Sequence, residues 1–248
     1  MALADFSRLN PVVAKRLKPL VEKMVRDWGD GITHLCVVGS ATTPDFDEKV
    51  SDINTLAVLS RISFSDLGML AEAGAGFGQR GLAAPMLFTR VQIERSLDVF
   101  PVEFLTFRLH HQCILGDDLL AGIEIGKGPL RMQLERELRR ILIRMNHDYL
   151  RARGDRKLLE DLLRGCYSAI LPLLTALVYM KGEPIPEDRA GLTAAACRVA
   201  GIDQTPLASL EQLRRRQIKP DVKELTTTCE QIYAILEKLT DVVDALKA

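Results

Sequence analysis

Two short polar segments beside apolar runs carry the residues best suited to chemistry. Gly39 and Ser40 follow the run THLCVV, and the segment SDIN places Asp52 and Asn54 at the start of the run INTLAVL. Side chains alternate along a strand, so Asp52 and Asn54 are expected on one face. Hard oxygen ligands suit Mg²⁺, glycine lets backbone approach phosphates, and serine donates hydrogen bonds to them. The pattern predicts a site for a magnesium-bound triphosphate.

This order of residues resembles the nucleotidyltransferase superfamily, the polymerase-β-like group that includes aminoglycoside-modifying members. The family signature is a Gly-Ser at the end of the first strand, an Asp-x-Asp on the next strand and a third carboxylate on a later strand. Gly39, Ser40 and Asp52 match this signature, and Asn54 stands where the second aspartate is expected. The candidate for the third carboxylate is Glu103, the only acid in the run VEFLTF. The resemblance extends over about residues 30 to 120.

The resemblance implies transfer of a nucleoside monophosphate from a nucleoside triphosphate to an acceptor hydroxyl. In such enzymes two Mg²⁺ ions lie between the carboxylates and the triphosphate. Asp52 and Glu103 would be the catalytic carboxylates, and together with Asn54 they would be the metal ligands. The expected nucleotide contacts are Gly39, Ser40 and Ser51. A neutral amide at position 54 removes one negative charge beside two dications, which predicts weaker metal affinity.

Two functions remain open at this point. The first is a magnesium-dependent enzyme that transfers a nucleotidyl group to a small-molecule or protein acceptor. The second is a catalytically degenerate member that acts as a nucleotide-binding, regulatory or interaction module. Asp45, Asp47 and Glu48 precede Ser51, and any of them is a candidate to replace the missing charge.

Hydrophobic periodicity predicts the elements that position these residues. A helix is expected over residues 11–28, because a proline opens it and apolar residues recur at helical spacing. A short helix over 66–75 is followed by a glycine-rich linker at 74–81. The expected strands, rich in apolar and β-branched residues, are 33–38, 53–59, 85–89 and 102–107, with a further short strand after residue 109. These elements predict a mixed α/β domain over residues 1–125.

The second half of the chain has a different pattern. Leu, Arg, Glu and Ala at a period of 3.6 predict a helical-bundle domain over residues 126–248. Its helices are expected at 130–153, 156–180, 189–200, 209–218 and 221–247. Basic clusters in this half are typical of solvated helix faces, and the alternative is that Arg139, Arg140 and Arg144 hold phosphates or an acidic acceptor. The amphipathic last helix also admits a homo-oligomer.

Composition narrows the class of protein. The 248 residues are 47% hydrophobic and 27% charged, as in a globular protein with a core. Lys plus Arg equals Asp plus Glu at 33 each and aromatic residues make up 5%, which disfavours nucleic acid and membrane partners. Five dispersed cysteines without a CxxC pair disfavour both a zinc site and a disulfide framework, and favour a reducing cytosol. With no signal-type apolar segment, we expect a cytoplasmic protein.

Overall fold

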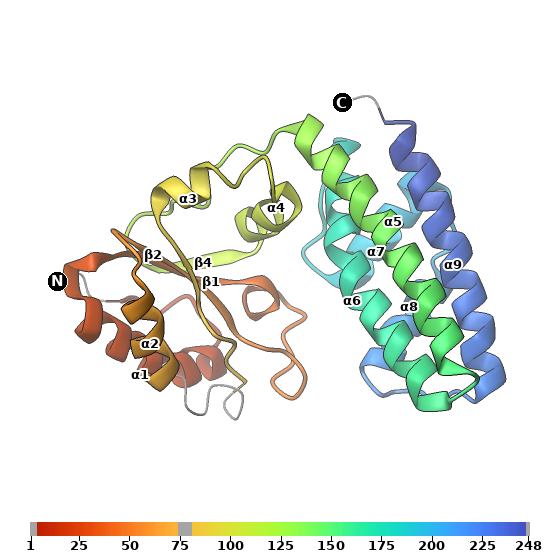
Figure 1. Cartoon of the computed structure of the whole chain (residues 1–248), viewed down its shortest axis with the longest axis horizontal. Helices are drawn as coiled ribbons and strands as arrows, with labels where there is room; N and C mark the ends of the chain where they lie inside the picture. Colours follow the sequence, from red (N-terminus) through yellow and green to blue (C-terminus); the bar gives the residue numbers. More distant parts are fainter. Residues whose placement is uncertain (1–3, 74–80, 247–248) are drawn as a thin grey trace. The chain divides into compact units, whose positions relative to one another are not determined.

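The computed structural model describes residues 4–73 and 81–246, which divide into two compact units. One unit comprises Met1–Val99 and Phe104–Ile125, and the other comprises Phe100–Glu103 and Gly126–Ala248. Figure 1 shows the sheet-containing unit in red to yellow-green and the helical unit in green to blue. Residues 74–80 of the expected glycine-rich linker lie outside the described residues.

A four-stranded mixed sheet forms the centre of the first unit. β1 (Ile32–Val38) pairs antiparallel with β2 (Asn54–Leu59) on one side and with β4 (His111–Leu115) on the other. β3 (Met86–Phe88) pairs parallel with β2, which gives the order β3-β2-β1-β4. The strands predicted at 33–38, 53–59 and 85–89 are confirmed, as is the short strand after residue 109. The mixed α/β class is therefore correct for this unit.

The helices α1 (Pro11–Trp28) and α2 (Phe64–Ala73) contribute to one hydrophobic core with the sheet, and Figure 1 shows them near each other. Asn10 caps α1 by accepting a hydrogen bond from the Val12 N–H at 2.9 Å. The buried face of α1 shares this core with Leu35 and Val37 of β1. Since side chains alternate along β1, Cys36 and Val38 point to the opposite face of the sheet. Two short 3-10 turns, η1 (Gly29–Gly31) and η2 (Gly39–Thr42), flank β1.

The strand predicted over residues 102–107 is wrong. The segment forms the helix α4 (Pro101–Leu109), preceded by the short helix α3 (Arg90–Glu94). Pro101 suits the first turn of a helix, where its missing N–H costs no hydrogen bond. Val102 and Leu105 are buried three residues apart, at helical rather than strand spacing. Glu103 therefore lies on a helix and not on the sheet.

The second unit is a helical bundle, as expected. Its helices are α5 (Lys127–Ala152), α6 (Arg156–Met180), α7 (Arg189–Ala200), α8 (Thr205–Arg214) and α9 (Val222–Asp244). The bounds predicted for α6 and α7 agree with the structure, whereas α8 begins four residues before the expected 209. Asp155 and Asp188 cap α6 and α7 by accepting backbone N–H bonds, which marks these starts clearly in the sequence.

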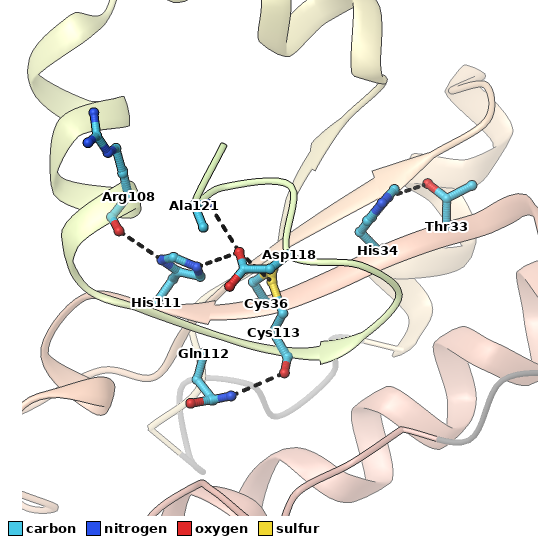
Figure 2. The surroundings of a disulfide bond; sticks show 9 residues. All are labelled: Thr33, His34, Cys36, Arg108, His111, Gln112, Cys113, Asp118 and Ala121. Carbon is cyan, nitrogen blue, oxygen red and sulfur yellow. Dashed lines mark hydrogen bonds and ion pairs between the residues drawn. A yellow bond between two sulfur atoms is a disulfide. The ribbon is translucent and has the colours of Figure 1, made fainter. Parts of the chain in front are cut away.

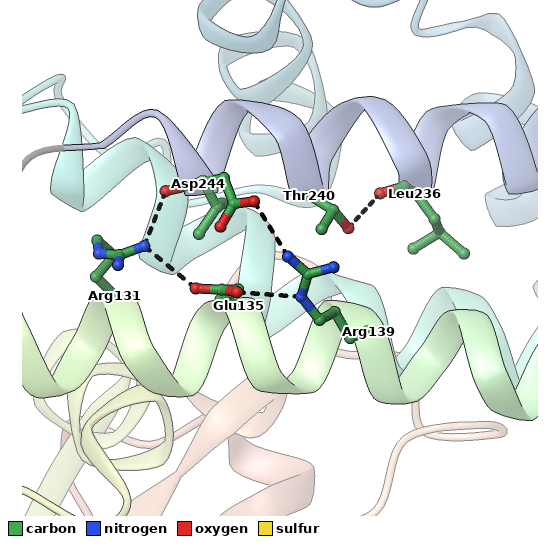
Figure 3. A network of polar contacts seen from close by, with 7 residues as sticks. Arg131, Glu135, Arg139, Leu236, Thr240 and Asp244 are labelled. Carbon is green, nitrogen blue, oxygen red and sulfur yellow. Dashed lines mark hydrogen bonds and ion pairs between the residues drawn. The ribbon is translucent and has the colours of Figure 1, made fainter.

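A polar network joins α5 to α9 (Figure 3). The Glu135 carboxylate accepts hydrogen bonds from Arg131 at 3.2 Å and from Arg139 at 3.0 Å. Arg139 also donates to Asp244 at 3.1 Å, and Arg131 donates to the Val243 carbonyl at 3.4 Å. The basic face of α5 is therefore used here to hold the C-terminal helix.

The helix α6 is the core of the bundle. It is long and apolar enough, by length and composition, to cross a membrane, and it is the one such helix among the described residues. Of its most apolar 18-residue window, 61% is buried inside the structure. This burial is typical of a core helix, because a bundle must enclose at least one apolar element.

Candidate nucleotide-binding edge of the sheet

The predicted site lies where β1 ends and two neighbouring strands begin. Val38, the last residue of β1, pairs with Asn54 on β2 and with His111 on β4. Both neighbours run antiparallel to β1, so their first residues meet the end of β1 at one edge of the sheet. Directly opposed residues of an antiparallel pair share a face, and Val38, Asn54 and His111 therefore face the same way.

Gly39 turns the chain at this edge. Its φ of +77° is in the left-handed region that favours glycine, and its N–H donates to the His110 carbonyl at 2.8 Å. A Cβ at this position would stand 3.9 Å from Nδ2 of Asn54. The structure thus places the Gly-Ser turn beside the Asn54 amide, as the two polar segments predicted.

Ile53 orients its two polar neighbours. Its side chain is fully buried, its N–H donates to the Gly81 carbonyl at 2.8 Å, and its own carbonyl accepts from Ala83 at 3.0 Å. With Ile53 fixed toward the core, Asp52 and Asn54 project to the other side of the strand. Asp52 is exposed and Asn54 is half-buried. The shared face of Asp52 and Asn54 stays a prediction from the alternation, because Asp52 precedes β2.

The loop between β1 and β2 is held together by its own acidic residues. Asp47 accepts from the Lys49 N–H at 2.9 Å through its carboxylate and from the Ser51 N–H at 2.7 Å through its carbonyl. The Ser51 hydroxyl in turn accepts from the Asp47 N–H at 3.1 Å. Glu48 forms an ion pair with Arg16 at 3.4 Å. The carboxylates of Asp47 and Glu48 were candidates to supply the negative charge that Asn54 lacks. Both are instead engaged in contacts that stabilise this loop.

Arg16 is a residue of this region that the sequence patterns did not single out. It extends from α1, donates to the Glu48 carbonyl at 3.2 Å, and would lie 3.2 Å from a Cβ at Gly81. Gly81 is the residue whose carbonyl holds Ile53. Arg16 therefore binds the loop that precedes Asp52 and lies near Gly81, and no local motif in α1 indicates this role.

Three polar side chains at the edge have no partner within the part of the chain that the structure describes. Neither hydrogen bonds nor ion pairs engage the side chains of Ser40, Asp52 and Asn54 there. Ser40 and Asn54 are half-buried, and polar groups in such positions usually have partners, whereas Asp52 is exposed to solvent. The sequence pattern also selected Ser51, but its side chain is buried and its hydroxyl accepts from the Asp47 N–H, so its role as a nucleotide contact stays a prediction.

The structure provides no third carboxylate on the sheet. Neither Met86–Phe88 nor His111–Leu115 contains Asp or Glu. Glu103, the predicted third ligand, lies on α4, and its Oε2 accepts a hydrogen bond from Gln133 at 2.7 Å. Gln133 also accepts from the Val102 N–H at 2.8 Å, so this contact ties the start of α4 to α5 within the helical unit. A metal-binding role for Glu103 stays a prediction.

The alternative basic site lies within the helical unit. Arg140 and Arg144 line a pocket of about 340 Å³ together with Glu103 and Glu137. Arg140 lies 3.5 Å from Glu137, and Arg144 lies 3.6 Å from Asp148. Because each arginine has an acidic partner, the pocket is of mixed charge and not a dedicated phosphate site.

The chain combines a mixed sheet that has a Gly-Ser turn at its edge with a helical bundle that follows it, and this fold resembles that of an aminoglycoside nucleotidyltransferase. Among solved structures, the chain is similar to spectinomycin adenyltransferase AAD(9) from Enterococcus faecialis, determined with ATP and spectinomycin. The TM-score is 0.52 and the sequence identity 10%, over 93% of this chain and 98% of that chain. No protein-family model matches the sequence, and no curated protein sequence matches it. At this identity the likeness is one of fold.

Proposed function

We propose that this protein binds a nucleoside triphosphate, as its magnesium complex, at the edge formed by Gly39, Ser40, Asp52 and Asn54. It acts there as a binding or regulatory module rather than as a nucleotidyl-transferring enzyme. The observation that carries this proposal is the donor set at the edge. Asp52 is the one carboxylate placed there by the predicted pattern, Asn54 is neutral, and β3 and β4 carry no acid.

The available groups suit one metal-bound triphosphate. Mg²⁺ is commonly held by one or two protein carboxylates together with phosphate oxygens and water, so Asp52 can complete the coordination that the triphosphate itself begins. The Ser40 hydroxyl and the Asn54 amide can donate hydrogen bonds to phosphate oxygens. The nucleotide class is supported by AAD(9), which was solved with ATP.

The same groups do not fit two metal ions. A two-ion site uses several carboxylates to offset four positive charges, and one of the ions supplies activation of the attacking oxygen. Asp52 with a neutral Asn54 offers one negative charge. The edge therefore favours holding the triphosphate over activating an acceptor hydroxyl.

Nucleotidyl transfer to a small-molecule or protein hydroxyl is the competing function. It is favoured by the likeness to AAD(9), whose structure contains both ATP and spectinomycin. It requires a further carboxylate, and Glu103 is the candidate that the sequence offered. A transferred nucleotide can be detected directly as a mass increase of the acceptor, so an activity assay separates the two functions.

A thermal-shift titration tests binding. The full chain is heated with ATP, GTP, CTP or UTP, each with Mg²⁺ and with EDTA. A nucleotide at about 100 times its Kd adds roughly 2.7 kcal/mol to the free energy of unfolding, and we expect this gain with Mg²⁺ for at least one of the four. Asp52→Ala should remove the gain, whereas Asp30→Ala, at an exposed carboxylate outside the site, should retain it.

Two results would overturn the proposal. The first is the absence of stabilisation by all four nucleotides, and the second is an Asp52→Ala variant that binds as tightly as the natural chain. A nucleotidylated acceptor formed from ATP and spectinomycin, or on the protein itself, would replace the binding module with the enzyme.

A further inference from the structure

A second polar cluster lies on the sheet face that also carries Asn54 (Figure 2). Cys36 of β1 and Cys113 of β4 pair in register and form a disulfide, which corrects the expectation that the dispersed cysteines disfavour disulfides. His111 lies two residues before Cys113 on β4, so both side chains share this face. Asp118 reaches the cluster from the turn after β4, with its Oδ1 2.7 Å from His111 Nε2 and 3.7 Å from Cys113 Sγ.

The spacing of these groups is that of metal ligands. One ligand atom each from His111, Cys113 and Asp118 lies within 4.8 Å of the other two. The Cys36 sulfur is bonded to the Cys113 sulfur, so it lies directly beside this group. One sulfur, one imidazole nitrogen and one carboxylate oxygen therefore lie close together, with a second sulfur adjacent to them. Zn²⁺ accepts this combination in tetrahedral sites, and thiolate ligands discriminate against Mg²⁺ and Ca²⁺.

The orientation of His111 provides an independent argument. Its Nδ1 lies 3.0 Å from the Arg108 carbonyl oxygen, which can only accept, so Nδ1 carries the proton and donates. Nε2 faces the Asp118 carboxylate, which also only accepts, so Nε2 donates to it here and can bind a metal ion once that proton is released. Histidines that bind metals through one nitrogen commonly donate the other N–H to a backbone carbonyl or carboxylate, which fixes the ring. Asp118 is fixed as well, because its Oδ1 accepts from the Ala121 N–H at 3.0 Å.

We propose that reduction of the Cys36–Cys113 disulfide creates a zinc site, in which both thiolates, His111 Nε2 and the Asp118 carboxylate bind one Zn²⁺. The disulfide and the zinc complex use the same sulfur atoms, so each form excludes the other. The His111 side chain is 9% exposed and the Asp118 side chain is 52% exposed, so the ion can enter from the Asp118 side.

The zinc site forms in two steps, reduction of the disulfide and binding of the ion. A phosphine reductant and water convert the disulfide into two thiols and a phosphine oxide, which supplies the two electrons and two protons that the sulfurs gain. Zn²⁺ then binds both sulfurs as thiolates and His111 through Nε2, and the protons that these three atoms carried go to solvent. Reoxidation requires the ion to leave, so zinc protects the reduced form.

The metal ligands and the proposed nucleotide contacts are different residues, although the Gly39 N–H bonds to the carbonyl of His110, next to His111. His111 and Asn54 pair with the same residue, Val38, from opposite sides, so their backbones are two strand spacings apart, about 10 Å. The inference does not depend on nucleotide binding. Failure of either proposal leaves the other intact.

Metal uptake by the full chain tests the inference. The protein is reduced with a phosphine, which unlike a dithiol competes weakly for zinc, and is titrated with Co²⁺ and then Zn²⁺ under anaerobic conditions. We expect one Co²⁺ per reduced chain, with the visible absorption of a tetrahedral ion and a thiolate-to-cobalt charge-transfer band, both abolished by Zn²⁺. The oxidised chain should show neither.

Matched variants assign the ligands. His111→Gln and Asp118→Asn should each weaken Zn²⁺ binding by at least about tenfold. His147→Gln and Glu124→Gln, at exposed positions elsewhere, should not change it. Asp118 is an exposed turn residue, so its variant keeps the test valid if His111→Gln fails to fold. The inference is overturned by a reduced chain that takes up no Co²⁺, by a spectrum without the thiolate band, or by unchanged affinity in the Asp118 variant.

Discussion

The side-chain amide of Asn54 faces the bare Cα of Gly39, with Nδ2 3.9 Å from the point a Cβ would occupy. An amide can donate a hydrogen bond through this atom, which a carboxylate cannot do. The family signature places a metal-binding aspartate at this position. In the proposed function, Asn54 therefore supplies a hydrogen-bond donor beside the Gly-Ser turn where the resembled family has a metal ligand.

Replacing Asn54 with aspartate should reverse this exchange. In Mg²⁺ the Asn54→Asp variant should bind its nucleotide about fivefold to tenfold more tightly, because the new carboxylate adds a charged metal ligand. In EDTA it should bind more weakly, because the carboxylate repels the triphosphate. Calorimetric titration in both conditions measures the effect, with Asn146→Asp on α5 as the control. Equal affinities of variant and natural chain in both conditions would remove Asn54 from the site.

At Gly116, directly after β4, the chain passes very close to the backbone of β1. Its φ is +75°, and a Cβ there would overlap the Thr33 carbonyl oxygen on β1. Gly29 has a φ of +52° and open space around the same position. Gly29→Ala should therefore lose about 1 kcal/mol from backbone strain alone. Gly116→Ala should lose a further 1–3 kcal/mol from the overlap, as measured by urea unfolding. Equal losses would mean that β1 and β4 are less closely packed than the structure shows.

Local signals explain which elements could be predicted from the sequence. The helix α1 is bounded by the Asn10 cap and by Gly29, and α7 is bounded by Asp188 and by Gly201 in the left-handed conformation. Such caps leave residue types that a single sequence displays. The strands β1 and β2 are short apolar runs that end at polar turns. The Gly-Ser turn and Asp52 could therefore be placed on adjacent strands.

Residues 102–107 show the limit of these signals. Their β-branched and aromatic residues favour a strand, whereas the segment forms a helix in which Val102 and Leu105 are each buried. This error also affected the predicted metal site, because Glu103 was expected on a strand of the sheet. The pairing of Cys36 with Cys113 also could not be predicted from the sequence. It depends on the register between two strands, and the two cysteines are 77 residues apart in the chain. The one local signal of the polar cluster around this disulfide was His111, two residues before Cys113.

Glu211 makes the helical unit sensitive to acid. Burial acts to raise its pKa, but hydrogen bonds from Arg214 and Arg215 outweigh this effect and lower the pKa to about 2. The folded value lies below the ordinary value of 4.5, so the folded state resists protonation. This contribution is fully present above about pH 4.5 and is lost as the pH falls toward 2, with a magnitude on the order of 2–3 kcal/mol.

Urea unfolding between pH 7 and pH 2 checks this dependence. Glu211→Gln should be less stable than the natural chain at pH 7 and should approach it near pH 2. Glu237→Gln, at an exposed position of α9, should follow the natural chain throughout. A constant difference between the Glu211 variant and the natural chain over this range would exclude the ionised carboxylate as the cause.

The cysteines should differ sharply in reactivity. Burial raises the thiol pKa of Cys166 to about 12 and those of Cys197 and Cys229 to about 11, so these three are poor nucleophiles at neutral pH. Iodoacetamide should therefore leave the native oxidised chain unlabelled.

After phosphine reduction in EDTA, iodoacetamide should label the half-buried Cys113 well before the buried Cys36. Peptide mass spectrometry measures the rate at each position. Labelling of Cys229 as fast as Cys113 would contradict the burial that the structure assigns. Zn²⁺ should slow the labelling of Cys113, because a metal-bound thiolate is a weaker nucleophile than a free one. In the Asp118→Asn variant the protection should require more Zn²⁺, since the ion loses its one carboxylate ligand.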